Sequence, residues 1–264
     1  MRKINTISNL YVEMKKGVLY GVWVFWLLML SSCLGDPATQ LTMANQAGVV
    51  VTGYGPGKAV YTKGDMVVSS ADFQKANVEN GECILFDYSI DYGSMNSMGV
   101  GTDTSYVEAV IYENTIYEVD RWDFYDTLTD TSVVVKNEQL LSSLQARSAY
   151  IRGNLFLFAE MSDHPAGQLD SFSLSYNPNR ILDDDRIYNL YLRTVRMKAD
   201  TVKGESMIIP CAFNIEALVD EAKKDNASEL KFRVNYAASF GKDSASINWK
   251  SSDIYTIELA GNGK

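Results

Sequence analysis

Apolar and polar residues alternate in short runs along most of this chain, and glycine, asparagine and aspartate separate the runs. In one run, period-two alternation places Ile84, Phe86, Tyr88 and Ile90 on the same face. Runs of this length and pattern predict half-buried strands of an antiparallel sheet. The strands expected in the first half are 48–54, 57–62, 65–69, 82–90, 105–112 and 115–124.

The second half repeats the strand pattern and adds one helix. Ile215, Leu218, Val219 and Ala222 recur at helical spacing, and Asn214 stands where a capping residue is preferred. The apolar stripe of this helix is expected to cover one open end of a β-sandwich. The strands expected around it are 149–161, 169–176, 186–197, 205–213, 230–236 and 254–259.

Changes in this pattern divide the chain into segments. Leu140, Leu141 and Leu144 have helical spacing in a short break between the two sets of strands, which predicts a linker there. The chain before the first strand is polar and lacks periodicity, as a tether does. The predicted divisions are a signal peptide (1–32), a tether (33–46), a first β-domain (47–135), a linker (136–147) and a β-sandwich (148–262).

The amino-terminal segment has the pattern of a secretory signal. An uninterrupted apolar stretch, 17–30, follows Lys15 and Lys16 and is too short to span a bilayer comfortably. Leu30, Ser31 and Ser32 precede Cys33 and complete a bacterial lipoprotein cleavage box. We expect cleavage before Cys33, lipidation of this residue and anchoring to a membrane by the lipid. Met1 and Met14 are both candidate start residues.

Charge and cysteine content narrow the classes of partner. The first 32 residues hold four basic and one acidic residue, which leaves 20 basic and 32 acidic residues after cleavage and a net charge of −12. Such a charge repels phosphate backbones, so nucleic-acid binding is not expected. Cys83 and Cys211 lie in apolar runs and are interpreted as separate buried thiols, with a disulfide between them left open.

No assembled catalytic or metal-binding motif stands out in the sequence. His164 is the single histidine and follows Asp163, but it is interpreted as part of a turn rather than as a catalytic base. The run 183–185, three aspartates, lacks the alternating spacing of a calcium loop, and a solvated turn is favoured. We therefore predict a protein that is not an enzyme and needs no metal or cofactor.

One aromatic segment is a candidate carbohydrate platform. Alternation places Trp122 and Phe124 on one side of a strand and Asp123 and Tyr125 on the other. Flat aromatic rings beside carboxylates can bind sugars, and the same rings also fill β-protein cores. Packing in a core is the favoured interpretation, and Trp122 is kept as a candidate ligand-facing residue.

Four features occur together in this chain: the cleavage box at Cys33, the Gly-Val-Val-Val opening strand, the segment 78–90 (Val-Glu-Asn-Gly-Glu-Cys-Ile-Leu-Phe-Asp-Tyr-Ser-Ile) and the segment 149–155 (Ala-Tyr-Ile-Arg-Gly-Asn-Leu). In this combination the chain resembles the NigD-like lipoproteins of Bacteroidetes. It implies an amino-terminal OB-type barrel followed by a β-sandwich, but no activity. The overall expectation is a mostly β chain with one short helix.

Export in such bacteria suggests two further features. Thr127, Thr201 and Ser244 each follow an aspartate and precede an aliphatic residue, which resembles the O-glycosylation acceptor of exported Bacteroidetes proteins. Asp36 is the one acidic residue soon after Cys33, whereas surface export signals in these bacteria are acidic clusters. We therefore expect an outer-membrane lipoprotein and prefer the periplasmic face over the cell surface.

Three functions fit these observations. The leading hypothesis is a lipid-anchored envelope protein that acts as a non-enzymatic binding or scaffold subunit for another envelope protein or a glycan. The first alternative is a fimbrillin-like structural adhesin, which would polymerise by strand addition. The second is a glycan-binding or glycan-hydrolysing accessory lipoprotein.

Overall fold

The structure, a computed structural model, describes residues 40–54, 57–91, 106–127, 130–178, 186–242 and 244–259. Cys33 and the run 183–185 lie outside these residues. The chain divides into two compact units, one made of Met1–Leu41 with Asp91–Asn96 and the other of Thr42–Ile90 with Ser97–Lys264. The second unit holds nearly all of the described residues, and two β-sheets build it.

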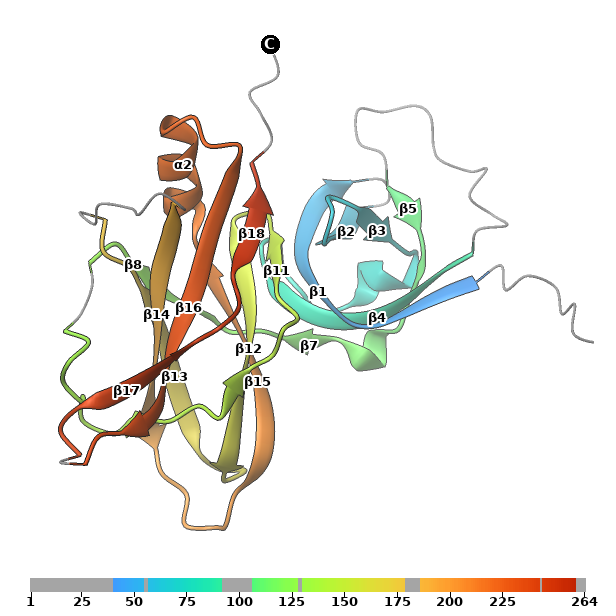
Figure 1. Cartoon of the computed structure of the whole chain (residues 1–264). Helices are drawn as coiled ribbons and strands as arrows, with labels where there is room; N and C mark the ends of the chain where they lie inside the picture. The colour runs from blue at the N-terminus through green and yellow to red at the C-terminus, as the bar shows by residue number, and fades with distance from the viewer. Residues whose placement is uncertain are drawn as a thin grey trace, which may run out of the picture. The chain divides into compact units, whose positions relative to one another are not determined.

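The first sheet curls into a small barrel (Figure 1). Its strands follow the order β5-β3-β2-β1-β4-β6, and β7 also pairs with β4. β3 and β5 run parallel, whereas β1 with β2, β2 with β3, and β4 with β6 and β7 pair antiparallel. The strands are β1 (Gln40–Tyr54), β2 (Gly57–Thr62), β3 (Val67–Ser69), β4 (Cys83–Asp91), β5 (Val107–Glu108), β6 (Val110–Ile111) and β7 (Tyr117–Glu118), with 3-10 turns η1 (Asp72–Lys75) and η3 (Glu113–Thr115).

The predicted buried face of β4 forms the centre of this barrel. Ile84, Phe86, Tyr88 and Ile90 are all buried, as the alternation required, and the rings of Phe86 and Tyr88 stack with centroids 5.2 Å apart. Gly48 of β1 lies so close to β2 that an added Cβ would stand 2.3 Å from Val60. Only glycine fits at this position, because any side chain would separate the two strands.

The predicted tether extends too far into the chain. Gln40–Gln46 belong to β1, although most of their side chains are exposed. β1 and β4 are hydrogen-bonded neighbours, and the Asn45 N–H donates to the Asp87 carboxylate at 2.6 Å. Backbone pairing therefore holds this segment in a strand without an apolar face, so the hydrophobic pattern could not reveal it.

The second sheet folds over on itself as a sandwich (Figure 1). One layer contains β10, β11, β12 and β15, and the other contains β13, β14, β16, β17, β18 and β9. The strands are β8 (Arg121–Tyr125), β9 (Glu138–Gln139), β10 (Ser143–Leu144), β11 (Ala149–Ile151), β12 (Asn154–His164), β13 (Leu169–Ser175), β14 (Ile187–Lys198), β15 (Glu205–Asn214), β16 (Glu229–Phe240), β17 (Ile247–Ser251) and β18 (Tyr255–Glu258).

Strand β8 joins the two layers of the sandwich, which places the start of the sandwich earlier in the chain than predicted. Arg121 and Trp122 pair in parallel with β15, and the next three residues of β8 pair in parallel with β13. The segment was expected within the first domain, 47–135, yet it belongs to the sandwich. An amphipathic strand fits either sheet equally well, and only its pairing partners decide which one it joins.

The expected linker at 136–147 contains short strands instead of a helical turn. β9 pairs with β14 and β10 pairs with β12. The Leu141 N–H donates to the Ala237 carbonyl, and Leu141 is buried. The three leucines therefore have helical spacing by coincidence, because long-range backbone hydrogen bonds determine their conformation.

The expected long strand 149–161 is a hairpin. β11 and β12 pair from Ala149↔Phe156 to Ile151↔Asn154 around a two-residue turn. Arg152 and Gly153, the turn residues, have φ values of +50° and +82°. Positive φ at both positions matches the twist of a tight hairpin.

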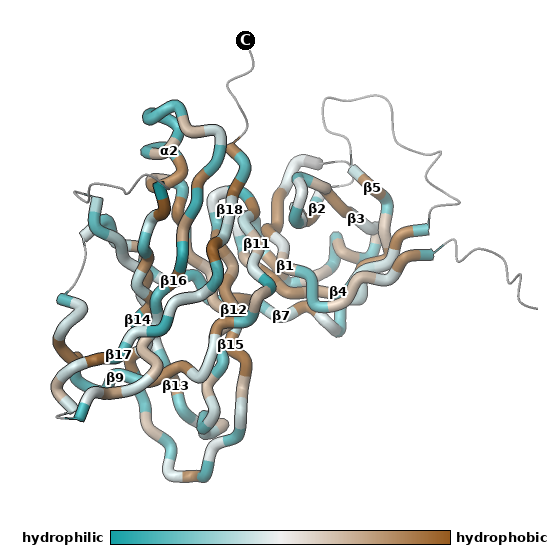
Figure 2. The backbone as a smooth tube through the Cα atoms, in the orientation of Figure 1, coloured by the Kyte–Doolittle hydropathy of each residue, from teal (hydrophilic) through white to brown (hydrophobic). Residues whose placement is uncertain are grey.

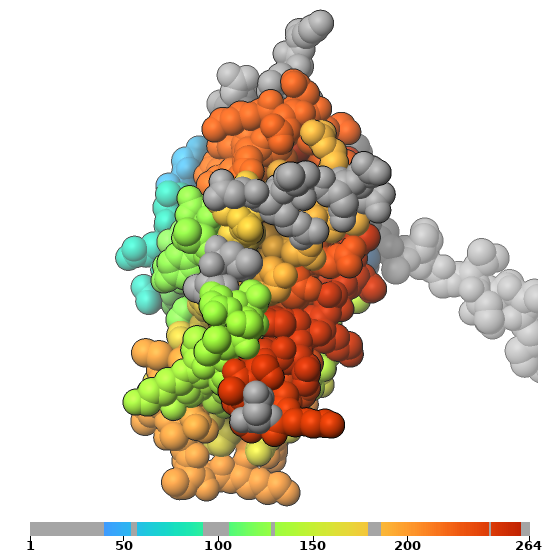
Figure 3. Space-filling model, turned by 60° about the vertical axis from the view of Figure 1, so that its left-hand side comes forward, coloured from blue at the N-terminus to red at the C-terminus, as the bar shows by residue number. Residues whose placement is uncertain are grey.

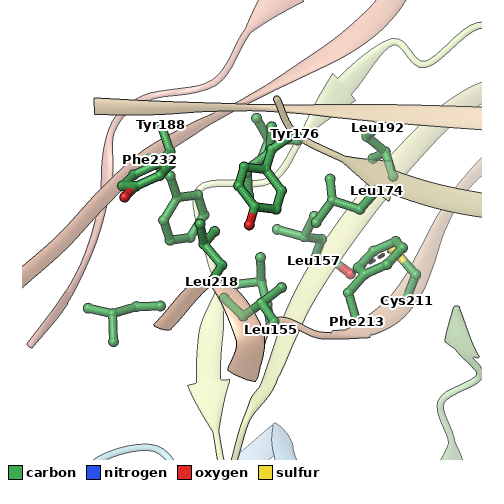
Figure 4. Packing of buried hydrophobic residues seen from close by; sticks show 14 of the residues in the cluster. Leu155, Leu157, Leu174, Tyr176, Tyr188, Leu192, Cys211, Phe213, Leu218 and Phe232 are labelled. Atoms are coloured by element: carbon green, nitrogen blue, oxygen red, sulfur yellow. Dashed lines mark hydrogen bonds between the residues drawn. The ribbon is translucent and has the colours of Figure 1, made fainter. Parts of the chain in front are cut away.

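The predicted helix is confirmed as α2 (Glu216–Lys224). The Asn214 Oδ1 atom accepts a hydrogen bond from the Glu216 N–H at 3.0 Å, so this side chain satisfies a free amide at the helix start. Leu218, Val219 and Ala222 are buried in the sandwich core. In Figure 4, Leu218 points toward Leu155 and its neighbours from the two layers.

Strand β12 separates two cores. Leu155 and Leu157 face the sandwich core, whereas Phe156 and Phe158 belong to a second buried cluster. Figure 2 shows β12 as one of the more hydrophobic strands. The second cluster unites side chains of both sheets: Val49, Cys83, Leu85, Val119, Ile151, Phe156, Phe158 and Ala212. A strand buried on both faces reads as a continuous apolar run rather than an alternating one.

Candidate functional site

The predicted histidine lies in a closed polar network. His164 Nε2 stands 2.9 Å from Asp170 Oδ2, and Gln168 Nε2 donates to both oxygens of that carboxylate. The side chain of His164 is 7% exposed and that of Asp170 is 1% exposed. The neighbour in sequence, Asp163, is not the partner found. With this little exposure, a substrate cannot reach the imidazole, so the network has the geometry of a structural contact.

The aromatic candidate Trp122 is half-buried. Its ring packs on Phe172, with centroids 5.7 Å apart, against the sandwich core. The predicted alternation along β8 is present, since Trp122 and Phe124 are half-buried while Asp123 and Tyr125 are exposed. Packing against the core leaves only part of the indole accessible to a ligand.

The remaining predicted sites lie on the surface or outside the described residues. Thr127, Thr201 and Ser244 are exposed, as glycosylation acceptors must be. Cys83 and Cys211 are free and buried, and burial raises the pKa of Cys83 to about 11 and also raises the pKa of Cys211. Within the described ranges, no group of three or more His, Cys, Asp or Glu side chains is arranged to hold a metal ion.

A cavity of about 870 Å³ was not predicted from the sequence. It opens between β18 and β11, two strands of the sandwich that each have a single pairing partner. The floor is apolar, because Leu155, Phe232 and Val219 of α2 line it, although these side chains belong to the sandwich core and are almost fully buried. Phe158, on the opposite face of β12, lines another part of the cavity. This volume is within the range of about 300–1,000 Å³ that is typical of ligand sites.

Charged and hydroxyl groups surround the apolar floor. Lys63, Arg147 and Lys223 line the cavity as cations, and Asp65 and Glu258 line it as carboxylates. The Arg147 guanidinium lies 4.0 Å above the ring of Phe158. Burial raises the pKa of Tyr150 and of Tyr255, which also line the cavity, so both hydroxyls stay protonated at neutral pH. The cavity therefore offers apolar contact, hydrogen bonding and charge at one place.

Sequence reasoning missed this site because its residues come from segments far apart in the chain. The lining is drawn from four regions, namely 44–47, 63–65, 146–158 and 219–259. No motif with fixed spacing connects them. The only early signal was the pair of expected strands at 149–161 and 254–259, whose pairing partners the sequence does not specify.

Comparison with protein families identifies the first sheet. Residues 38–116 match the family model of a lipoprotein OB domain. No curated protein matches the chain. Among the described residues, no helix is long and apolar enough to cross a membrane.

Solved structures share the fold over most of the chain. An uncharacterised protein from Parabacteroides merdae is 17% identical, with a TM-score of 0.67 over 83% of this chain and 99% of its own. A protein from Bacteroides fragilis titled as a lipoprotein is 11% identical, with a TM-score of 0.54 over 85% and 100%. A NigD-like immunity protein from Bacteroides caccae is 10% identical, with a TM-score of 0.49 over 82% and 97%. The predicted barrel-and-sandwich fold is confirmed, and the family match confirms the lipoprotein OB domain that the resemblance implied for the first half.

Proposed function

From the premise that residues 38–116 form a lipoprotein OB domain, we propose that this chain is an outer-membrane lipoprotein that binds a partner in the cavity between β11 and β18. The family match indicates membrane association through lipid. Cys33 is the proposed lipidated residue, because it completes the cleavage box in the sequence. The periplasmic face of the outer membrane stays our preferred location.

A single observation carries the binding role, namely a cavity whose lining combines apolar, hydroxyl and charged groups. A cavity of ligand-binding size with a few polar groups at its walls is the usual place of a binding site. The one histidine is enclosed with Asp170 and Gln168, which supports a role without catalysis. Trp122 remains a second candidate contact for a glycan, although its packing on Phe172 favours a role in the core.

The anchor is tested by comparing the wild type with Cys33→Ala in a Bacteroides host. We expect the wild type to fractionate with membranes and to carry a lipid-sized mass increment at Cys33, and the variant to lose both. Protease treatment of whole cells then reports the orientation, and we expect protection. An unmodified wild-type protein that retains its first 32 residues would refute the proposed anchor.

The binding role is tested with a variant that fills the cavity. Ser148 lines the cavity next to β11 and is half-buried. Ser148→Trp should abolish crosslinked complexes that the wild type forms in membranes, whereas Ser142→Trp, at an exposed position outside the cavity lining, should not. Identical crosslinked species from all three proteins would place the binding site elsewhere.

A further inference from the structure

The outer edge of β18 presents unpaired backbone groups. The Leu259 N–H donates to the Ser228 carbonyl, so the backbone N–H and C=O groups of Leu259 point toward β16. The direction of the backbone N–H and C=O groups alternates from one residue of a strand to the next. The backbone groups of Tyr255 and Ile257 therefore also point toward β16, and those of Thr256 and Glu258 point away from it. The described part of the chain supplies no partner for these outward groups.

Strand β11 presents a second free edge across the cavity. In a hairpin with a two-residue turn, the pair next to the turn is hydrogen-bonded and the following pair is not. Ile151↔Asn154 is the first pair here, and Tyr150↔Leu155 is the second. The backbone groups of Tyr150 therefore point away from β12, toward the cavity that Tyr150 lines.

The lining residues show that the edge of β18 faces the cavity along its length. All four residues of β18 line it, and Ala149 and Tyr150 of β11 line it as well. Side chains alternate between the two faces of a strand, so four consecutive strand residues line one space when the backbone edge borders it. The cavity is thus a groove with backbone donors and acceptors at its walls and with Leu155, Val219 and Phe232, almost fully buried, beneath it.

We propose that this groove accepts an extended polypeptide segment of a partner protein, which adds to β18 as a further strand. This inference rests on the proposed binding function and names the class of partner. A compact apolar ligand would cover the floor but leave the outward groups of Thr256, Glu258 and Tyr150 unsatisfied. An added strand satisfies these groups and places every second side chain beside the half-buried rings of Tyr150 and Tyr255.

The charges at the groove specify the segment further. Arg147 is exposed and lies over Phe158, and among the described residues no carboxylate forms an ion pair with it. Lys63 likewise has no ion pair in this part of the chain, whereas Lys223 pairs with Asp220 at 3.7 Å. The rim thus offers two cations that form no ion pair among the described residues, although the carboxylates of Asp65 and Glu258 line the same cavity. The partner segment should carry apolar residues at alternate positions and a carboxylate near Arg147.

The test uses a display library of random nine-residue peptides selected on the full-length lipoprotein in detergent. Two matched variants serve for counter-selection. Thr256→Pro removes the outward N–H without breaking a bond to β16, and Thr256→Val keeps it. Equal melting temperatures and circular dichroism spectra for the two variants check that both fold.

We expect selected peptides with period-two apolar residues and a carboxylate, bound by the wild type and Thr256→Val and at least tenfold more weakly by Thr256→Pro. The same peptides, resynthesised with N-methyl groups on the amides that would face β18, should bind the wild type at least tenfold more weakly than the unmethylated peptides. This second readout needs only the wild-type protein, so it decides the matter even when the proline variant is unstable.

Three outcomes would each overturn strand addition. The selected peptides could lack alternating apolar residues, they could bind equally well after N-methylation, or no peptide could bind the wild type better than Thr256→Pro. The proposed function has a separate outcome. When Ser148→Trp abolishes membrane complexes but no strand-forming peptide is selected, the cavity binds a partner of another class, such as a glycan. When Ser148→Trp changes nothing, the binding function itself fails.

Discussion

Arg193 and Glu138 form a buried ion pair that attaches a long connection to the sandwich. Arg193 Nη1 stands 3.0 Å from each oxygen of the Glu138 carboxylate, and Arg193 Nη2 donates to the Asp130 and Val133 carbonyls. Trp249 donates to the Thr131 carbonyl at 2.8 Å from β17. Figure 3 shows this connection, in green, beside the red carboxy-terminal strands. Removing one charge would leave the other buried without a partner.

We expect Arg193→Met to lower the free energy of unfolding by about 3–5 kcal/mol, the usual cost of leaving a buried charge unpaired. The double variant Arg193→Met, Glu138→Leu should be markedly more stable than the single variant, because it buries no charge. Urea denaturation followed by fluorescence measures both. A single variant as stable as the double would show that Glu138 does not depend on Arg193.

Tyr176 provides a pH-dependent contribution. Its hydroxyl donates to Glu221 at 2.6 Å, and burial together with this carboxylate raises the pKa of Tyr176 above its ordinary value of 10.0. The unfolded chain loses this proton near pH 10, while the folded chain keeps it. The stabilisation is therefore complete below pH 10 and declines as the pH rises toward the folded pKa.

Tyr176→Phe removes this titration. Between pH 9.5 and 11 the free energy of unfolding of the wild type should fall more steeply than that of the variant, since other buried tyrosines contribute equally to both proteins. Urea titrations at several pH values provide the comparison. Parallel curves would mean that Tyr176 titrates alike in the folded and unfolded chains.

At the scale of elements, local signals predicted α2 better than the strand boundaries. The spacing of Leu218, Val219 and Ala222 and the cap at Asn214 act within a few residues, so the sequence contains them completely. The extent of β1 and the pairing of β8 depend on residues far away in the chain. The cavity also depends on residues far apart in the chain, because the edges of two strands form its walls.

We expect Asn214→Ala to destabilise the protein by about 1 kcal/mol, because the Glu216 N–H loses its side-chain acceptor. Asn214→Ser should keep most of the stability, since a hydroxyl can accept the same bond. Thermal unfolding of the three proteins measures the difference. Equal losses for Ala and Ser would exclude capping as the reason.

At the scale of the whole molecule, the two buried thiols can be used to follow the unfolding of the two sheets, which the cluster around Phe156 connects. Cys83 packs in this cluster with Phe156 and Ala212, and Cys211 lies in the sandwich core. Both thiols are buried and protonated at neutral pH, so both should resist alkylation.

In the Cys33→Ser protein we expect alkylation of Cys83 and Cys211 to rise at the same urea concentration. Phe156→Ala, which truncates the shared cluster, should lower the midpoint for Cys83 and cost about 3–5 kcal/mol. Mass spectrometry of the labelled peptides provides the two curves. Labelling of Cys83 in native buffer, or at a much lower midpoint than Cys211, would show that the first sheet opens independently.

The sequence by itself determined the predominance of strands, the inward faces of β4 and β8, the helix α2 and the resemblance to barrel-and-sandwich lipoproteins, and it predicts the export signal. These features follow from periodicity and from motifs whose residues are neighbours in the chain. Only the tertiary structure decided that β8 joins the sandwich, that His164 pairs with Asp170 and that an open groove separates β11 from β18. Strand pairing is non-local, and identical alternation permits many partners, so an edge without a neighbour becomes visible only when all the strands are in place.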